Sequence, residues 1–139
     1  MTHDFKAWPE LTNNQMDLYY FESPHKQITD DFTAEVVGVH DADTVRVKWS
    51  ERDFTFPIRF ADTAAPEIDT ADGRTAQKFM QTRLLGKTID VTINPDNRVD
   101  KWGRILGLVS EGGQDVGEEL IMRGLATSWA DRNENQDLR

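Results

Sequence analysis

The sequence predicts an α+β fold, a small all-β barrel accompanied by helices, and three observations support this prediction. From residue 33 onward, short segments alternate apolar and polar residues, a pattern typical of strands with one buried face. Two longer segments instead repeat apolar residues with helical spacing. The chain has 139 residues, a length that suits one domain and can bury a core without covalent cross-links.

Three strands are predicted in the first half of the chain. Residues 33–39 form a largely apolar run, and residues 44–49 alternate cleanly between apolar and polar side chains. Residues 54–60 alternate again after a short polar turn, so the last two strands are predicted to form a hairpin. Pro57 lies inside the third strand and predicts an edge position or a bulge, because proline cannot donate a ladder hydrogen bond.

Two helices and two further strands are predicted in the second half. The first helix covers about residues 75–85, and strands follow over residues 88–93 and 103–110, where Gly107 predicts a bulge. The second helix covers residues 115–124, with Asp115 and Glu118 as a capping box and Gly124 as the C-cap. Five strands in a small all-antiparallel arrangement predict a partly open Greek-key barrel, the OB-fold.

Composition divides the chain into three parts. Residues 1–31 are predicted to be an N-terminal extension with a possible short helix, capped by Thr12 or Asn13. Residues 32–129 are predicted to form the barrel domain, and residues 130–139 a polar tail. Exposed aromatic clusters are rare on monomers, so the aromatic residues of the extension are expected to dock on the barrel; a partner-binding arm is the alternative. These residues are Tyr19, Tyr20 and Phe21.

Composition also excludes several classes of site. The chain has no cysteine, which rules out disulfide partners, zinc–thiolate sites and cysteine nucleophiles. Asp and Glu number 25 against 16 Lys and Arg, and this net charge of −9 argues against broad, charge-driven binding to nucleic acid. No segment approaches the roughly 18 apolar residues of a membrane helix. No signal peptide is recognised either, so a cytoplasmic protein away from membranes is expected.

Charged residues near the strand ends are the candidate functional residues. Asp41 and Asp43 open the second strand, where two carboxylates can face one cation or can bond the backbone of a turn. Arg59 lies in an otherwise apolar strand, where it can pair with an internal carboxylate or hold a phosphate. Glu67 directly follows a proline and is either a general base or a solvated loop acid. Arg104 enters the fifth strand behind a tryptophan that can stack on a base or cover the barrel.

The order of these motifs along the chain is more specific than any one of them. The matching segments are VHDADTVRV, FPIRFADTAAPE, LLGKTIDV, DKWGRILGLV and EELIMRGLA. Together they resemble the staphylococcal nuclease family from about residue 33 to residue 129, which leaves residues 1–31 outside the resemblance. The resemblance implies a barrel that hydrolyses phosphodiester bonds of DNA and RNA with Ca²⁺, or alternatively Mg²⁺ or Mn²⁺, as the cofactor.

The resemblance also implies a role for each candidate residue. Asp43 matches the metal carboxylate, and Asp41 matches an outer, supporting acid. Arg59 matches the first phosphate-binding arginine, and Arg104 matches the second, near the leaving group. Glu67 matches the residue that orients or activates the attacking water. In-line attack on a phosphodiester needs such an oriented water, a metal and cations beside the developing charge.

One position departs from the family pattern. The family usually has an aspartate, a second metal ligand, shortly before the proline–glutamate pair. Counting without gaps from Arg59 to Glu67 places Ala64 there, whereas a bulged segment would let Asp62 take the role. The sequence therefore favours a metal-dependent nuclease with metal candidates Asp43 and Asp62. The alternative is a non-catalytic OB-fold module that binds nucleic acid, nucleotide or protein.

Overall fold

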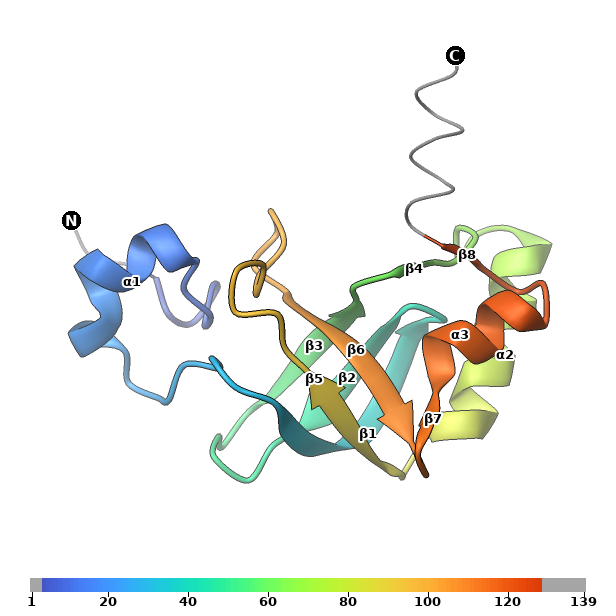
Figure 1. Ribbon diagram of the computed structural model, residues 1–139, viewed down its shortest axis with the longest axis horizontal. Helices are drawn as coiled ribbons and strands as arrows, with labels where there is room; N and C mark the ends of the chain where they lie inside the picture. The colour runs from blue at the N-terminus through green and yellow to red at the C-terminus, as the bar shows by residue number, and fades with distance from the viewer. Residues whose placement is uncertain (1–3, 129–139) are drawn as a thin grey trace, which may run out of the picture.

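The predicted barrel is present in the computed structural model of the chain, which describes residues 4–128 (Figure 1). The predicted polar tail, residues 130–139, lies outside the described residues. The barrel strands are β1 (Phe32–Asp41), β2 (Thr44–Lys48), β3 (Thr55–Phe60), β5 (Thr88–Thr92) and β6 (Ile105–Glu111). Two-residue strands β4 (Thr63–Ala64), β7 (Gln114–Asp115) and β8 (Thr127–Ser128) lie beside them. The helices are α1 (Asn13–Tyr19), the 3-10 turn η1 (Tyr20–Glu22), α2 (Ala71–Leu84) and α3 (Val116–Met122).

The barrel closes through a parallel pair of strands. Neighbouring strands follow the order β3-β2-β1-β5-β6, and β3 then pairs with β6 in parallel, Ile58 opposite Ile105. The prediction of an all-antiparallel arrangement is therefore wrong for this pair. Five barrel strands in the described chain are an odd number, so strand directions cannot alternate all the way around. Since β3 pairs on both sides, it is not the edge strand that Pro57 predicted, but Pro57 itself precedes the residues of β3 that pair with β6.

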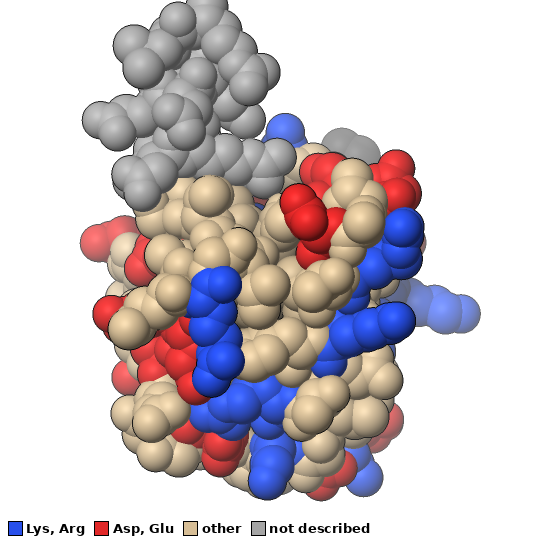
Figure 2. Space-filling view, turned by 90° about the vertical axis from the view of Figure 1, so that its right-hand side faces the viewer, with Lys and Arg blue, Asp and Glu red and all other residues tan. Residues whose placement is uncertain are grey.

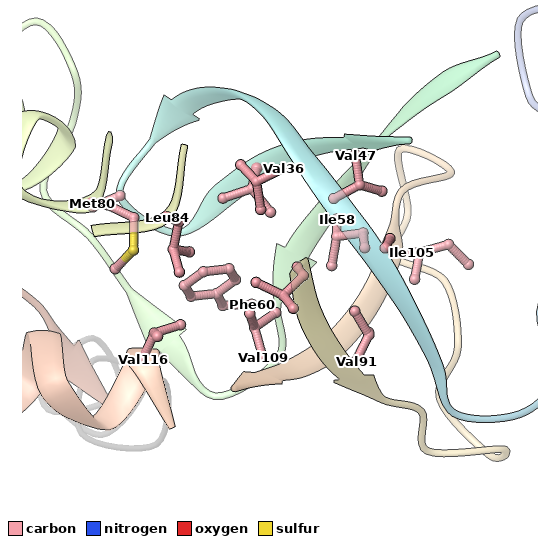
Figure 3. Close-up of a cluster of buried hydrophobic side chains, with 14 of the residues drawn as sticks. Val36, Val47, Ile58, Phe60, Met80, Leu84, Val91, Ile105, Val109 and Val116 are labelled. Carbon is pink, nitrogen blue, oxygen red and sulfur yellow. The ribbon is translucent and has the colours of Figure 1, made fainter. Parts of the chain in front are cut away.

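The apolar faces of the strands point into the barrel and form its core (Figure 3). Alternate residues of β2, β3 and β5 are buried, as the alternation in the sequence predicted. Met80 and Leu84 of α2 and Val116 of α3 close one end of this core, and all three are fully buried. Residues 61–67 continue from the end of β3 toward α3, where Thr63 lies against Gly117, and the charged candidates gather beside this segment and the segment before β6.

Gly107 serves close packing and not the predicted bulge. A Cβ at Gly107 would lie 2.5 Å from Cγ1 of Val91 on the adjacent β5. The β5–β6 register is regular, with Val91 opposite Val109. Register shifts occur instead in β1 against β2, one of them between Val39 and Asp41. The irregular pairing therefore lies at the end of β1, directly beside the acidic pair.

The first predicted helix begins earlier than expected, at Ala71, because Thr70 caps it. The Thr70 hydroxyl accepts a hydrogen bond from the Gly73 amide at 3.0 Å. A Cβ on Gly73 would lie 1.8 Å from the Glu67 carbonyl oxygen, so only glycine lets this turn of helix reach the preceding loop. The start was missed because the first turn is polar and carries no apolar periodicity. Its consequence is that α2 fixes the backbone of Glu67.

The caps predicted for the last helix are largely confirmed. The Asp115 carboxylate accepts a hydrogen bond from the Glu118 amide at 3.0 Å and begins α3. Gly124 follows the helix with φ of +71°, the left-handed conformation that glycine adopts at helix ends. Within residues 4–128, no helix is both long enough and apolar enough to cross a bilayer.

The N-terminal segment contacts the barrel through Leu11, Ile28 and a buried ion network. Leu11 and Ile28 flank the short α1, which Thr12 caps as predicted, and both are fully buried. Docking of Tyr20 and Phe21 was predicted wrongly, since their side chains are 50% and 98% exposed. The aliphatic residues on either side of the helix take the buried positions instead.

Glu10 is the centre of this buried network. Its carboxylate pairs with Arg52 of the β2–β3 turn and, at 2.6 Å, with Arg98 of the segment before β6. All three side chains are almost completely buried. Its Oε2 also accepts a hydrogen bond from the Ile28 amide at 2.8 Å. One carboxylate thus connects three segments that lie far apart in the sequence.

Replacing Glu10 with Ala should destabilise the fold strongly, because two buried guanidinium groups would lose their shared counter-charge. Breaking a buried ion pair from one side typically costs about 3–5 kcal/mol. Urea denaturation measures the free energy of unfolding, with Glu51→Ala in the exposed β2–β3 turn as the control. A Glu10→Ala loss no larger than that of Glu51→Ala would show that the network does not hold the segment in place.

Candidate functional site

The charged candidates meet in a pocket of about 460 Å³ at one end of the barrel. The end of β1, the β1–β2 turn, the end of β3, residues 65–67 and the segment before β6 all contribute to its lining. Five of the predicted residues line it: Asp41, Asp43, Arg59, Glu67 and Arg104. Side chains from separate segments thus face one solvent-accessible space, which is the arrangement that a phosphodiester site needs.

Asp43 is buried in the β1–β2 turn and connects three segments around the pocket. Its Oδ2 accepts a hydrogen bond from the Ala65 amide at 2.8 Å and lies 3.3 Å from Nη2 of Arg59. Its Oδ1 accepts a hydrogen bond from the Thr44 hydroxyl at 3.1 Å. The side chain is 8% exposed, so these contacts offset the cost of burying a carboxylate.

Arg59 takes the first of the two roles left open by the sequence, since it pairs with a carboxylate, and it also lines the pocket. It lies opposite Thr44 in the β2–β3 ladder, which directs it toward the β1–β2 turn. Its Nη1 donates to the carbonyl oxygens of Phe60 and Thr63, each at 2.6 Å. The guanidinium group is therefore held in a fixed orientation while its side chain remains part of the pocket wall.

Asp41 carries a buried oxygen, Oδ1, without a hydrogen-bond partner among the described residues. Burial raises the pKa of Asp41, and His40 opposes this effect by lowering it. The carboxylates of Asp43 and Glu67 raise the pKa of Asp41 further, whereas Arg104 lowers it. The same oxygen lies 3.7 Å from Nε2 of His40, which is itself largely exposed. A buried carboxylate oxygen that accepts no hydrogen bond and lies beside two other acids is a position where a bound cation would be favourable.

Arg104 is oriented by Asp100, four residues earlier in the same tight turn. Asp100 Oδ1 accepts hydrogen bonds from the amides of Trp102 and Arg104, both at 2.9 Å. Its Oδ2 lies 2.7 Å from Nε of Arg104. Asp100 thus engages the inner edge of the guanidinium group and leaves its terminal nitrogens toward the pocket. The signal in the sequence was an aspartate three residues before a glycine, typical of an Asx turn, but no role was predicted for it.

Glu67 lies exposed at the mouth of the pocket, on a turn that α2 holds in place. The Glu67 carbonyl oxygen accepts hydrogen bonds from the Thr70 amide at 3.0 Å and from the Thr70 hydroxyl at 2.6 Å. With Gly73 packed against the same carbonyl, the backbone is fixed from two sides. The carboxylate itself remains accessible to solvent, as the attack of a water molecule would require.

Asp62 is not brought to this pocket. Its side chain is exposed and lines neighbouring hollows beside Gly107 and Leu108. The proposed bulge that would place Asp62 next to Asp43 is absent from residues 61–67, where the Ala65 amide faces Asp43 directly. Ala64 is buried in β4, opposite Thr127 of β8. Neither Asp62 nor Ala64 lines the pocket, so the choice between the ungapped and the bulged alignment stays a prediction.

The donor set around the pocket fits a cation that shares its ligands with a substrate. No three Asp, Glu or His side chains within residues 4–128 are grouped closely enough to hold a metal ion by themselves. Four carboxylates line the pocket, and Asp41 and Asp43 are the two that come from the end of β1 and the β1–β2 turn. Hard divalent cations in phosphoryl-transfer sites are commonly held by one or two carboxylates, with water and substrate phosphate supplying the rest.

The face that carries α2 and α3 has a mixed charge. Figure 2 shows Lys and Arg side chains on this face interspersed with Asp and Glu. Arg83 of α2 pairs with Glu111 and, at 3.2 Å, with Glu119. Basic side chains that are paired with acids in this way are typical of a solvated surface and are less suited to binding a polyanion.

Comparison with known proteins places these features in a family. The family model described as "Staphylococcal nuclease homologue" matches residues 57–139. A micrococcal nuclease of Shigella flexneri is 32% identical over 111 residues, which is 73% of this chain and 60% of that protein. An uncharacterized endonuclease of Escherichia coli is 33% identical over 108 residues, which is 77% of this chain and 66% of that protein. The chain thus spans less than two thirds of the length of either relative.

Replacing Asp41 with Asn should raise stability at neutral pH when EDTA keeps cations away. The folded protein raises the pKa of Asp41 above its ordinary value of 3.8, so it binds this proton more tightly than the unfolded chain does. Ionisation therefore lowers stability as pH rises above 3.8, and the full loss is present above the folded-state pKa.

Urea denaturation of both proteins at about pH 7 and about pH 3 measures this effect. The variant should be more stable than the wild type at the higher pH, and the difference should disappear at the lower pH. An equal gain at both pH values would mean that the side-chain shape, and not its charge, is responsible.

Proposed function

Since the chain belongs to the staphylococcal nuclease family, we propose that it is a metal-dependent nuclease that hydrolyses phosphodiester bonds of DNA or RNA. The observation that supports this proposal most directly is the meeting of two arginines and four acids in one pocket. A barrel that served only as a scaffold would have no need to bring Arg59, Arg104 and Glu67 together from three separate segments.

The two arginines suit the recognition of a scissile phosphate. Guanidinium groups bind phosphate oxygens through charge-assisted hydrogen bonds, and these bonds strengthen as negative charge develops during in-line attack. Arg59 is anchored by Asp43, and Arg104 is anchored by Asp100 at its Nε edge. Because both groups are held before substrate binds, little reorganisation is needed in the transition state.

Glu67 is the candidate to orient the attacking water and accept its proton. It is exposed at the mouth of the pocket, and its backbone is fixed by α2. Its charge also interacts with Asp41, so the two carboxylates lie near each other. A carboxylate in this position can act as a general base once a water molecule lies between it and the phosphorus.

Asp41 and Asp43 are the residues that would hold a divalent cation, Ca²⁺ in the first instance and Mg²⁺ or Mn²⁺ as alternatives. When bound, such an ion would polarise a phosphoryl oxygen and offset the charge of the transition state. The buried Oδ1 of Asp41, which accepts no hydrogen bond from the described residues, supports this assignment. Asp43 is already paired with Arg59, so it would have to share its oxygens between the cation and the arginine.

Cleavage of single-stranded DNA and of RNA, each assayed with Ca²⁺, Mg²⁺, Mn²⁺ or EDTA, tests the proposal. We expect cleavage with at least one cation and none with EDTA. The alternative, a non-catalytic module, is favoured by the alanine at position 64 and by the net charge of −9. Binding of either nucleic acid without cleavage under every condition would support that alternative and contradict the nuclease.

Glu67→Gln and Arg104→Ala should each slow cleavage by about 100-fold or more, because general-base and transition-state contacts typically contribute this much. Neither change should unfold the protein, since both side chains end in the open pocket. The measurements are kcat/KM for a short oligonucleotide and the thermal midpoint. Glu51→Gln and Arg46→Ala, both exposed and outside the pocket, are the matched controls. Wild-type rates in the first two variants would remove these residues from the mechanism.

Ala64→Asp should increase cation affinity and, with it, the rate of cleavage. Ala64 is buried and does not itself line the pocket, but it directly precedes Ala65, which does and whose amide donates to Asp43. The ungapped spacing from Arg59 to Glu67 puts the second carboxylate of the family at this position. Ca²⁺ prefers about six to eight oxygen ligands, and the variant adds both ligand oxygens and charge. Calorimetric titration with Ca²⁺ measures the affinity, with Asp62→Ala as the comparison. A loss of affinity in Asp62→Ala, with none gained in Ala64→Asp, would favour the bulged alignment.

A further inference from the structure

The N-terminal segment, residues 4–31, packs against the loop that carries Arg104. This loop, residues 94–104, connects β5 to β6 and lies between the N-terminal segment and the end of β3 (Figure 1). The family match begins at residue 57, so the segment lies outside it. The contacts between the two are polar, numerous and buried, which sets them apart from incidental packing.

Arg98 is the main polar connection between the loop and the segment. It is 4% exposed, and its guanidinium group is bonded entirely within residues 10–28. It donates to the Ile28 carbonyl oxygen at 2.6 Å, to the Leu11 carbonyl oxygen at 3.0 Å and to Oδ1 of Asn13 at 3.2 Å, in addition to its ion pair with Glu10. All three guanidinium nitrogen atoms of this one side chain therefore bind the N-terminal segment.

Asn13 and Trp8 add contacts at the two ends of the loop. Asn13 Nδ2 donates to the Pro95 carbonyl oxygen at 2.9 Å. Trp8 lies directly on Gly103, where a Cβ would stand 2.4 Å from Cε3 of the indole ring. Gly103 also has φ of +83°, so both its conformation and the indole require glycine. Trp8 thus covers the outer side of the residue that precedes Arg104.

The inner side of the same turn forms part of the pocket wall. The Gly103 amide donates to the Asp100 carbonyl oxygen at 3.0 Å, and the Arg104 amide donates to the Asp100 carboxylate. The turn exposes Trp102, and Val99 just before it pairs with Ile105 and packs against the core. Contact with Trp8 on one side and the Asp100 turn on the other confines Arg104 to one position.

We propose that the N-terminal segment is a brace that positions Arg104 for the substrate phosphate. The positioning residues are Trp8 of the segment and Arg98 of the loop. The inference rests on the proposed nuclease function, because it assigns the segment a part in that reaction. Neither Trp8 nor Arg98 lines the Arg104 pocket, so both act through the loop. A misplacement of about 1 Å at a catalytic group can cost up to about 100-fold in rate, so a partial loss of the brace is measurable.

A double-mutant cycle between Trp8 and Arg104 tests the brace. Trp8→Ala should lower kcat/KM for a short oligonucleotide by about 10-fold, and Trp8→Phe should restore most of it. In an Arg104→Ala background, Trp8→Ala should have little further effect, because the residue through which it acts is already absent. Phe21→Ala is the matched control, an aromatic residue of the same segment that is 98% exposed.

Amide hydrogen exchange at Gly103 and Arg104 tests the brace without any reaction. Exchange should be faster in Trp8→Ala than in the wild type and unchanged in Phe21→Ala. If the wild type cleaves nothing with any cation, the proposed function fails, and this measurement still decides whether the segment holds the loop. Unchanged exchange in Trp8→Ala would overturn the brace. So would an undiminished effect of Trp8→Ala on cleavage in the Arg104→Ala background, which would mean that Trp8 acts on the substrate directly.

Discussion

The carboxylate of Asp43 is the contact on which the rest of the site depends. It binds the side chain of Arg59 and the amide of Ala65, while the Asp43 carbonyl oxygen accepts a hydrogen bond from Phe60 at 2.8 Å. One residue in a short turn therefore fixes the end of β3 and the segment that leads to Glu67. Its charge also sets the constraint on the pocket, because a cation and Arg59 would both use the same carboxylate.

Barrel closure brings the second arginine to the same place. The parallel β3–β6 pair sets Arg59 opposite Leu106, two residues after Arg104. The two guanidinium-bearing residues thus approach each other through backbone register, although they are far apart in the sequence. An antiparallel closure would reverse β6 and carry Arg104 to the other end of the barrel. The odd number of barrel strands makes the closing pair parallel, and the site requires this parallel pair to bring the two arginines together.

Each pocket arginine has its own acid, and this bears on how a chain of net charge −9 would bind the polyanion proposed as its substrate. Arg59 pairs with Asp43, and Arg104 pairs with Asp100. Each pair holds its guanidinium group in place, but the carboxylate cancels part of the positive charge of the pocket. Recognition would then depend on one phosphate held in a defined geometry and on a cation, more than on long-range attraction. The buried carboxylate of Glu10 follows the same principle away from the pocket, where it orders two further arginines.

The sequence by itself determined the strands, most of the helix caps and five residues that line the pocket, because local residue patterns are enough to predict each of these features. Alternation reports which face of a strand is buried, and the motif order placed Arg59 and Glu67 at their family spacing. Tertiary structure decided the parallel closure, the exclusion of Asp62 and the docking of the N-terminal segment through Leu11 and Ile28. These features depend on which distant segment packs against a residue. The local periodicity of apolar residues does not identify the distant segment, because the same pattern of exposed and buried residues is compatible with several pairings.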